Sequence, residues 1–281
     1  MQTAHDLLHL TGTADRGWSR RSWRLAWADL REGVSGWEVW TMLGWNEIRR
    51  RYRRSALGPF WITLSMVTFI GFVSLLYARL LNASHPDYIP YVAASYLTWT
   101  MIAAFLNEGP LTFVGWTGYL QQMRFAKSTF VMAVVWRNLM MFLHHLPVVL
   151  VVLLWFGVYP TAWTLLLIPG MLALLALGAF LALILGMVGA RFRDLASFTQ
   201  SLVTMLFFFT PILYRREVLG EYSYLIDWNP FGYFLDAVRA PLMGQPPEAL
   251  TWPVVIAVLL LLGTCAFAMF ARYRPRITYW L

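Results

Sequence analysis

Six long runs of apolar residues, separated by short polar segments, dominate the sequence. A stretch of about twenty such residues can cross the hydrocarbon core of a bilayer as an α-helix. The third run is the least regular, because Arg137 lies near its start. The pattern predicts an all-α integral membrane protein with six transmembrane helices, at residues 58–78, 88–106, 131–156, 162–190, 195–214 and 252–270.

Basic residues are distributed unevenly around these runs, and cytoplasmic segments of membrane proteins are enriched in Lys and Arg. Ten arginines precede the first run. The segments that face the same side hold Arg124, Lys127, Arg191, Arg193, Arg272, Arg274 and Arg276, whereas the opposite side holds Arg79, Arg215, Arg216 and Arg239. The asymmetry predicts that both termini are cytoplasmic.

Composition agrees with a membrane protein, since 59% of the 281 residues are hydrophobic and 13% are charged. The net charge is +8, and all basic residues except Lys127 are arginines. Because these arginines flank apolar runs, we expect membrane lipids and phosphorylated lipids as partners, and no nucleic acid. A lone cysteine excludes a disulfide framework within the chain and a cysteine-based zinc site.

The segment before the first run is predicted to form an interface helix. Ser35 and Glu38 have capping-box spacing, which marks a helix start. Trp37, Trp40, Gly44, Ile48 and Tyr52 then share one helical face, and Arg49, Arg50, Arg53 and Arg54 lie near the other. Such a helix lies in the membrane interface or packs on a partner as a soluble helix. The sequence thus divides into a cytoplasmic N-terminal segment with this helix, 1–57, and a six-span transmembrane domain, 58–281.

A further short helix is predicted between the fifth and sixth runs. Asn229 and Pro230 are typical of a helix start, and Gly244 of a helix end. The helix over residues 231–243 is too short to span a bilayer, and Asp236 and Arg239 would keep it partly hydrated. We expect a re-entrant element at the outer surface or an amphipathic anchor lying on that surface.

Signatures of catalysis and of energy coupling are missing. The acidic residues are scattered, whereas membrane glycosyltransferases cluster them around a metal. Lys127 follows no glycine-rich loop, so the chain lacks an ATP-binding motif. The adjacent His144 and His145 suit interhelical hydrogen bonds, with a proton relay as the alternative. Glu108 and Arg137 lie at matching depths on consecutive runs and are predicted to form a structural ion pair, with a role in transport as the alternative.

Several short motifs together resemble the permease subunits of ABC exporters for O-antigen and capsular polysaccharides. The likeness covers about residues 37–281, and residues 1–36 match no pattern of that family. The motifs occur in the family's order, as RYRRSALGPFW at 51–61, LNEG at 106–109, VWRN at 135–138, RFRD at 191–194, FTPI at 209–212, NPF at 229–231 and VRAPL at 238–242.

The resemblance implies a bacterial inner-membrane homodimer that works with two separate ATP-binding cassette subunits. ATP and magnesium would bind those subunits, and no cofactor is expected in this chain, which is then not itself an enzyme. The implied substrate is an undecaprenyl-pyrophosphate-linked glycan, moved from cytoplasm to periplasm. The family's coupling helix would fall within 111–127, and its lateral opening lies between the first and fifth spans.

Candidate site residues follow from this resemblance and from residue chemistry. The Arg guanidinium binds two phosphate oxygens at once, and sugar rings can stack on aromatic rings and slide along them. The alternative is that the arginines anchor the chain in the membrane and the aromatic residues serve in packing, which are their ordinary roles. The lipid-pyrophosphate entrance is assigned to Arg50, Arg51, Arg53, Arg54, Arg191 and Arg193, and the channel to Trp61, Phe69, Tyr77, Phe207, Phe208, Phe209 and Tyr214. ATPase coupling is assigned to Trp116, Tyr119, Arg124 and Lys127, and the outer gate to Trp228, Phe231, Asp236 and Arg239.

Two other functions are compatible with the same pattern. One is an ABC permease for a drug or another lipid. A neighbouring gene for an ATPase, without genes for glycosyltransferases nearby, would favour it. The other is a membrane glycosyl- or phosphotransferase, which the scattered carboxylates disfavour.

Overall fold

The computed structural model describes residues 19–53, 60–80, 87–123 and 125–281, and these contain helices and no strand. The first two helices are α2, Arg20–Ser35, and α3, Trp37–Tyr52. The long helices are α4, Phe60–Leu80; α5, Tyr88–Glu108; α7, Lys127–Trp155; α8, Leu167–Arg191; α9, Leu195–Phe209; and α12, Thr251–Trp280. The shorter α-helices are α6, Thr117–Gln122; α10, Tyr224–Asp227; and α11, Pro230–Leu242. The 3₁₀ helices are η1, Gly109–Leu111; η2, Val114–Trp116; η3, Ala162–Leu166; and η4, Arg216–Ser223.

Within the described residues, four helical segments are long and apolar enough to cross a membrane, namely Tyr88–Leu111, Lys127–Trp155, Ala162–Arg191 and Thr251–Trp280. Two shorter apolar segments, Thr63–Leu76 within α4 and Leu195–Phe209, coincide with the predicted first and fifth spans. The predicted fifth run, 195–214, is too long for its helix. Thr210 is extended, with φ −98° and ψ 137°, because the ring of Pro211 disfavours helical backbone in the preceding residue.

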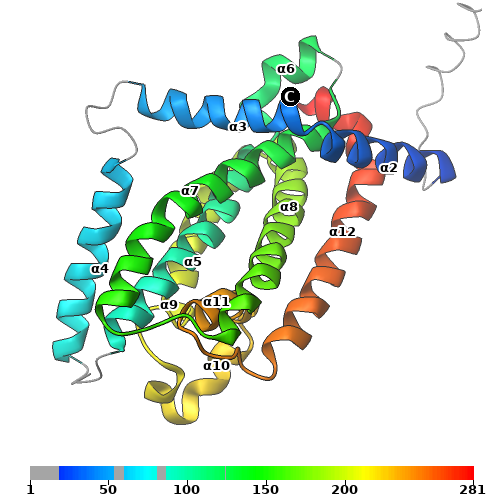
Figure 1. Cartoon of the computed structure of the whole chain (residues 1–281). Helices are drawn as coiled ribbons and strands as arrows, with labels where there is room; N and C mark the ends of the chain where they lie inside the picture. The colour runs from blue at the N-terminus through cyan, green and yellow to red at the C-terminus, as the bar shows by residue number, and fades with distance from the viewer. Residues whose placement is uncertain (1–18, 54–59, 81–86, 124) are drawn as a thin grey trace, which may run out of the picture.

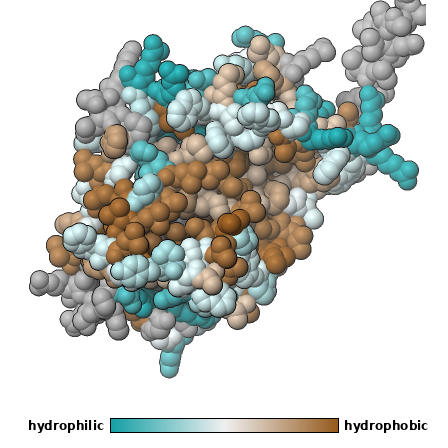
Figure 2. All heavy atoms as spheres, in the orientation of Figure 1, coloured by the Kyte–Doolittle hydropathy of each residue, from teal (hydrophilic) through white to brown (hydrophobic). Residues whose placement is uncertain are grey.

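The long helices form a bundle with a different set of short elements at each end (Figure 1). Helices α2 and α3 cross one end, where α6 and the C-terminus also lie, and α10 and α11 lie at the other end. Hydrophobic residues form a broad belt between more hydrophilic ends (Figure 2). This distribution is the one a multi-pass membrane protein needs.

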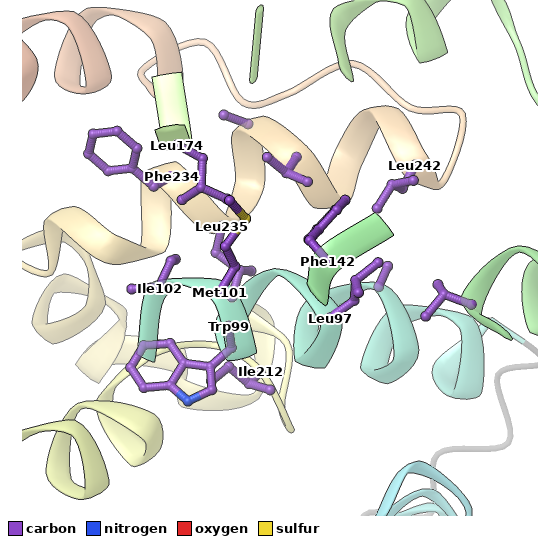
Figure 3. Packing of buried hydrophobic residues seen from close by; sticks show 14 of the residues in the cluster. Leu97, Trp99, Met101, Ile102, Phe142, Leu174, Ile212, Phe234, Leu235 and Leu242 are labelled. Carbon is purple, nitrogen blue, oxygen red and sulfur yellow. The ribbon is translucent and has the colours of Figure 1, made fainter. Parts of the chain in front are cut away.

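Helix α11 is enclosed by the bundle rather than laid on its surface. Its start and end agree with prediction, since the Asn229 side chain accepts a hydrogen bond from the Phe231 N–H, and Gly244 has a φ of 69°. Phe234 and Leu235 are almost completely buried. They pack into the same core as α5, to which Leu97 and Met101 belong (Figure 3).

Helix α3 packs across α7, but the details differ from the prediction. Ser35 ends α2 and donates to the Glu32 carbonyl oxygen at 3.1 Å, so Ser35 cannot cap α3. Gly36 precedes α3 and makes no side-chain cap. Gly44 lies against α7, where an added Cβ would stand 2.9 Å from the Ala133 carbonyl oxygen. Because a side chain at this position would clash with α7, the lack of one allows this face of α3 to be buried against α7.

The face of α3 that packs on α7 is largely the predicted one, since Trp40 of that face is half-buried and its ring lies 5.6 Å from that of Trp136. Leu43, Gly44 and Ile48 are buried, whereas Trp37 is 60% exposed and Trp45 is 52% exposed. The predicted break at Gly58 and Pro59 lies outside the described residues.

Helix α2 was not predicted, and one of its carboxylates caps the start of α7. Asp29, which is 5% exposed, accepts hydrogen bonds from the Ser128 N–H at 3.0 Å and the Ser128 hydroxyl at 2.9 Å. The Arg274 guanidinium of α12 lies 3.0 Å from the other Asp29 oxygen. The first N–H groups of a helix lack partners within that helix, and Asp29 provides one for the Ser128 N–H of α7. Through Ser128 and Arg274, Asp29 joins α2 to both α7 and α12.

Candidate functional site

Five side chains from three helices form a cluster near the α3 end, which we call the α3 cluster: Glu47, Arg51, Glu108, Arg137 and Asn138. Glu108 and Arg137, predicted as an ion pair, lie 2.6 Å apart. Glu108 also accepts from Arg51 at 3.2 Å and from the Asn138 amide at 2.8 Å. Arg137 pairs in addition with Glu47 of α3. The cluster thus fastens α3 to α5 and α7.

A small cavity of about 140 Å³ adjoins this cluster. Arg51, Glu108, Asn138 and His145 contribute to its walls. The Nε2 atom of His145 is buried and has no hydrogen-bond partner among the described residues. The space is large enough for a few water molecules. His144 instead meets Thr63 of α4 at 3.0 Å, which is the interhelical hydrogen bond expected of this pair.

An aromatic groove of about 570 Å³ lies between α4, α5 and α9. Phe69 stacks on Tyr96 with ring centroids 4.1 Å apart, and Phe207 meets both Phe69 and Trp99 edge to face, at 6.2 Å and 6.0 Å. The groove wall also includes Glu108, so the groove reaches the α3 cluster. Tyr96 and Trp99 were missed in the sequence because α5 reads as an ordinary apolar span.

The other predicted channel residues are spread around this groove. Phe208 lines the groove and is 63% exposed, whereas Phe209 and Trp61, at 57% and 58% exposure, are not among its lining residues. The Tyr214 hydroxyl donates to the Phe208 carbonyl oxygen at 2.8 Å. Tyr77 lies outside the residues whose side chains are described.

The predicted entrance arginines occupy different surroundings. Arg50, Arg53 and Arg193 are exposed, and Arg50 stands 5.8 Å from the Trp116 ring. Arg191 is also exposed and stacks near Phe192 and Trp280, at 5.2 Å and 5.7 Å. Arg51 belongs to the α3 cluster, and Arg54 lies outside the described residues. Burial raises the pKa of nearby Tyr52, an effect that Arg51 opposes.

The segment predicted to meet the ATPase turns through η1, η2 and α6 at the α3 end. Trp116 is buried and packs edge to face with Tyr119, whose ring centroid lies 5.6 Å away. Tyr119 is 45% exposed, so it is available to a partner. Lys127 begins α7 and is half-buried, and Arg124 lies outside the described residues.

A second polar cluster holds α11 in place, and we call it the α11 cluster: Tyr91, Pro211, Asp236, Arg239 and Thr251. Arg239 donates to the Tyr91 hydroxyl at 2.6 Å, to the Pro211 carbonyl oxygen at 3.0 Å and to Asp236 at 3.2 Å. The other Asp236 oxygen accepts from the Thr251 hydroxyl at 2.7 Å. Asp236 and Arg239, predicted to be partly hydrated, are each 11% exposed in their side chains and border a cavity of about 210 Å³.

The remaining predicted gate residues frame α11. Trp228 precedes the helix and is 85% exposed, and Phe231 in its first turn is partly buried against the main core. Arg216 pairs with Asp227 at 2.7 Å and with Glu248 at 3.3 Å across the same cavity.

The profile of ABC-2 type transporters matches residues 38–243, which include the α3 cluster, the aromatic groove and the α11 cluster except Thr251. The chain belongs to the ABC-2 type transporter family. It is thus a multi-pass membrane permease of the ABC transporter class.

Two similar proteins have a more specific name. The O-antigen export system permease protein RfbA of Myxococcus xanthus is 27% identical over 235 residues, which cover 82% of this chain and 90% of that relative. A protein of the same name from Klebsiella pneumoniae is 24% identical over 191 residues, which cover 66% of this chain and 72% of the relative.

Proposed function

We propose that this chain is the membrane subunit of an ABC exporter for an undecaprenyl-pyrophosphate-linked polysaccharide, an O-antigen or a related cell-surface glycan. Export would run from cytoplasm to periplasm across the bacterial inner membrane, through six spans with both termini in the cytoplasm. A second copy of the chain would complete the channel, and two separate ATPase subunits would bind ATP and magnesium.

The aromatic groove is the observation that carries this proposal. It combines flat rings, on which sugar rings can stack and slide without strong polar bonds, with one end at the arginine-rich side of the bundle. Arg51, Glu108 and Asn107 lie at that end, and Arg53 and Arg193 are exposed on the same side of the bundle. A lipid-linked pyrophosphate would meet these guanidinium groups first, because Arg forks pair with phosphate oxygens.

The test is replacement of two exposed arginines by lysine, which keeps the positive charge but loses the fork. We choose Arg53→Lys with Arg193→Lys, because Arg191 also stacks on rings and would confound the result. The expected variant inserts normally and copurifies with its ATPase, yet accumulates lipid-linked glycan inside the cell and displays little on the surface. Arg49→Lys, also exposed, is the matched control.

Surface display at the wild-type level by the double variant would leave these arginines with membrane anchoring alone. Deletion of the gene separates the functions: normal glycan display in the null strain, with loss of drug or other lipid efflux, would identify another type of ABC permease. Glycosyl transfer by the purified chain without an ATPase would instead identify an enzyme.

A further inference from the structure

An open groove of about 900 Å³ lies between α2 and α12, on the side of the bundle away from α4 (Figure 1). Seven α2 residues and one α12 residue form it, since it is lined by Trp23, Arg24, Trp27, Ala28, Arg31, Glu32, Ser35 and Phe267. The groove is separate from the aromatic groove and from both polar clusters, because they share no lining residue.

Three rings form the apolar part of this α2–α12 groove. Trp23 packs on Phe267 with centroids 5.1 Å apart, and Trp27 meets the same ring edge to face at 6.2 Å. Trp27 nevertheless remains 64% exposed. Exposed tryptophan beside a membrane span is typical of the headgroup level of a bilayer, where one part of the ring contacts lipid and another contacts water.

Two arginines form the polar part. Arg24 and Arg31 are seven residues apart and therefore share one face of α2. Both are exposed, and neither has an ion pair or hydrogen bond within the described residues. Glu32 also lines the groove, while Asp29 is buried beneath the helix with Ser128 and Arg274. The groove thus carries one excess positive charge, on guanidinium groups that are free to bind an anion.

Exposed apolar residues of α12 lie between the groove residue Phe267 and the opposite end of that helix. Ile256, Leu260 and Leu261 are 53%, 66% and 68% exposed within a helix that is apolar enough to cross a membrane. Phe267 lies seven residues after Leu260, on the same face. At 1.5 Å per residue, Ile256 to Phe267 spans about 16 Å, which is about half of a 30 Å hydrocarbon core and so one leaflet.

We propose that the α2–α12 groove binds an anionic phospholipid. Its phosphate lies between Arg24 and Arg31, its glycerol region lies against Trp23 and Trp27, and an acyl chain follows α12 toward Ile256. A water-soluble subunit does not fit this surface, because Phe267 of the groove lies on the same face of an apolar, membrane-length helix as the exposed Ile256 and Leu260. Figure 2 shows the hydrophilic α2 end projecting beside the hydrophobic flank, as this arrangement requires.

Native mass spectrometry of the delipidated full-length protein, with added phosphatidylglycerol or phosphatidylcholine, tests the site. Two surface arginines together provide enough attraction to expect about tenfold tighter binding of phosphatidylglycerol. Arg24→Gln with Arg31→Gln should remove that preference. Arg49→Gln with Arg276→Gln, which removes the same charge from exposed positions outside the groove, should keep it. Equal affinity for the two lipids in the wild-type protein, or an unchanged preference in the Arg24/Arg31 variant, overturns the proposal.

A second measurement leaves both arginines in place. A fluorophore is attached at Ala28→Cys in a Cys265→Ser background, and brominated phosphatidylglycerol is added as a small fraction of a phosphatidylcholine vesicle. We expect strong quenching at Ala28 and weak quenching at Val34→Cys, an exposed α2 position outside the groove. Equal quenching by brominated phosphatidylcholine, or shielding of Ala28 that depends on protein concentration and so marks a second copy, contradicts the lipid site. Because neither measurement involves glycan export, failure here is distinct from failure of the proposed function.

Discussion

The α3 cluster and the α11 cluster differ in the partners that surround their central arginine. Each fastens a helix to the rest of the bundle through an arginine whose side chain is mostly buried. In the α3 cluster, Arg137 pairs with two carboxylates, Glu47 and Glu108. In the α11 cluster, Arg239 has one carboxylate partner, and its other hydrogen bonds go to a tyrosine hydroxyl and a backbone carbonyl.

This difference determines how each cluster tolerates damage. Removing the central cation of the α3 cluster leaves two carboxylates with reduced compensation, and truncating one partner of a buried pair is far more costly than the net value of the pair. The α11 cluster concentrates fewer charges and spreads its bonds over neutral groups. We therefore expect the two clusters to respond to neutralisation in a definite order.

The largest expected effect is that of Arg137→Gln. The substitution leaves Glu47 without its buried partner and Glu108 with only Arg51 and Asn138, so the free energy of unfolding should fall by about 3–5 kcal/mol. Thermal unfolding of the detergent-purified protein measures this loss, with exposed Arg49→Gln as the control. A loss no greater than that of the control would show that the cluster does not stabilise the fold.

The same cluster makes a charge swap a poor rescue. Glu108→Arg together with Arg137→Glu would bring a cation beside Arg51 and a carboxylate beside Glu47, so the double variant should be no more stable than the less stable single variant. Recovery of wild-type stability would mean that Glu108 and Arg137 act as an isolated pair.

A smaller effect is expected from Asp236→Asn in the α11 cluster. One Asp236 oxygen accepts from the Glu248 N–H at 2.9 Å and from the Thr251 hydroxyl, and the other faces Arg239. The Asn side chain keeps one oxygen acceptor, but its NH₂ group then faces either Arg239 or the donors of Glu248 and Thr251. The unfolding free energy should therefore fall by about 1.5–3 kcal/mol, the value of a hydrogen bond to a charged group. The measurement is again thermal unfolding, compared with Asp194→Asn at an exposed position. A larger loss than that of Arg137→Gln would reverse the proposed order.

Sequence reasoning succeeded where a single charge or helix signal was sufficient. The all-α fold class and the positions of the long apolar helices follow from the lengths of the apolar runs. The boundaries of α11 follow from Asn229 and Gly244. The proximity of Glu108 and Arg137 follows from two opposite charges at matching depth. These signals are local, or they join consecutive helices.

Features that depend on a crossing between distant helices were not predicted. Glu47 and Arg51 join the α3 cluster only because Gly44 lets α3 lie close to α7. Tyr91 and Pro211 carry no charge, so nothing in the sequence marks them as partners of Arg239. The capping of α7 by α2 was not predicted either, because it depends on Asp29, which is 99 residues before Ser128.

The smallest expected effect, and the sharpest test of how the α3 cluster divides its work, is that of Arg51→Gln. The Arg51 side chain is 54% exposed and lies 3.2 Å from Glu108, and exposed ion pairs contribute about 0–1 kcal/mol. Glu108 keeps Arg137 and Asn138, so we expect a loss of less than about 1 kcal/mol, which shrinks further in 1 M salt as the Debye length falls to about 3 Å. In an Arg137→Gln background, Arg51 becomes the only cation that the described residues place on Glu108, and the same substitution should then cost more. A double-mutant cycle by thermal unfolding measures this coupling directly. Strict additivity of the two losses would mean that Arg51 and Arg137 do not share Glu108, and the α3 cluster would then be two independent contacts.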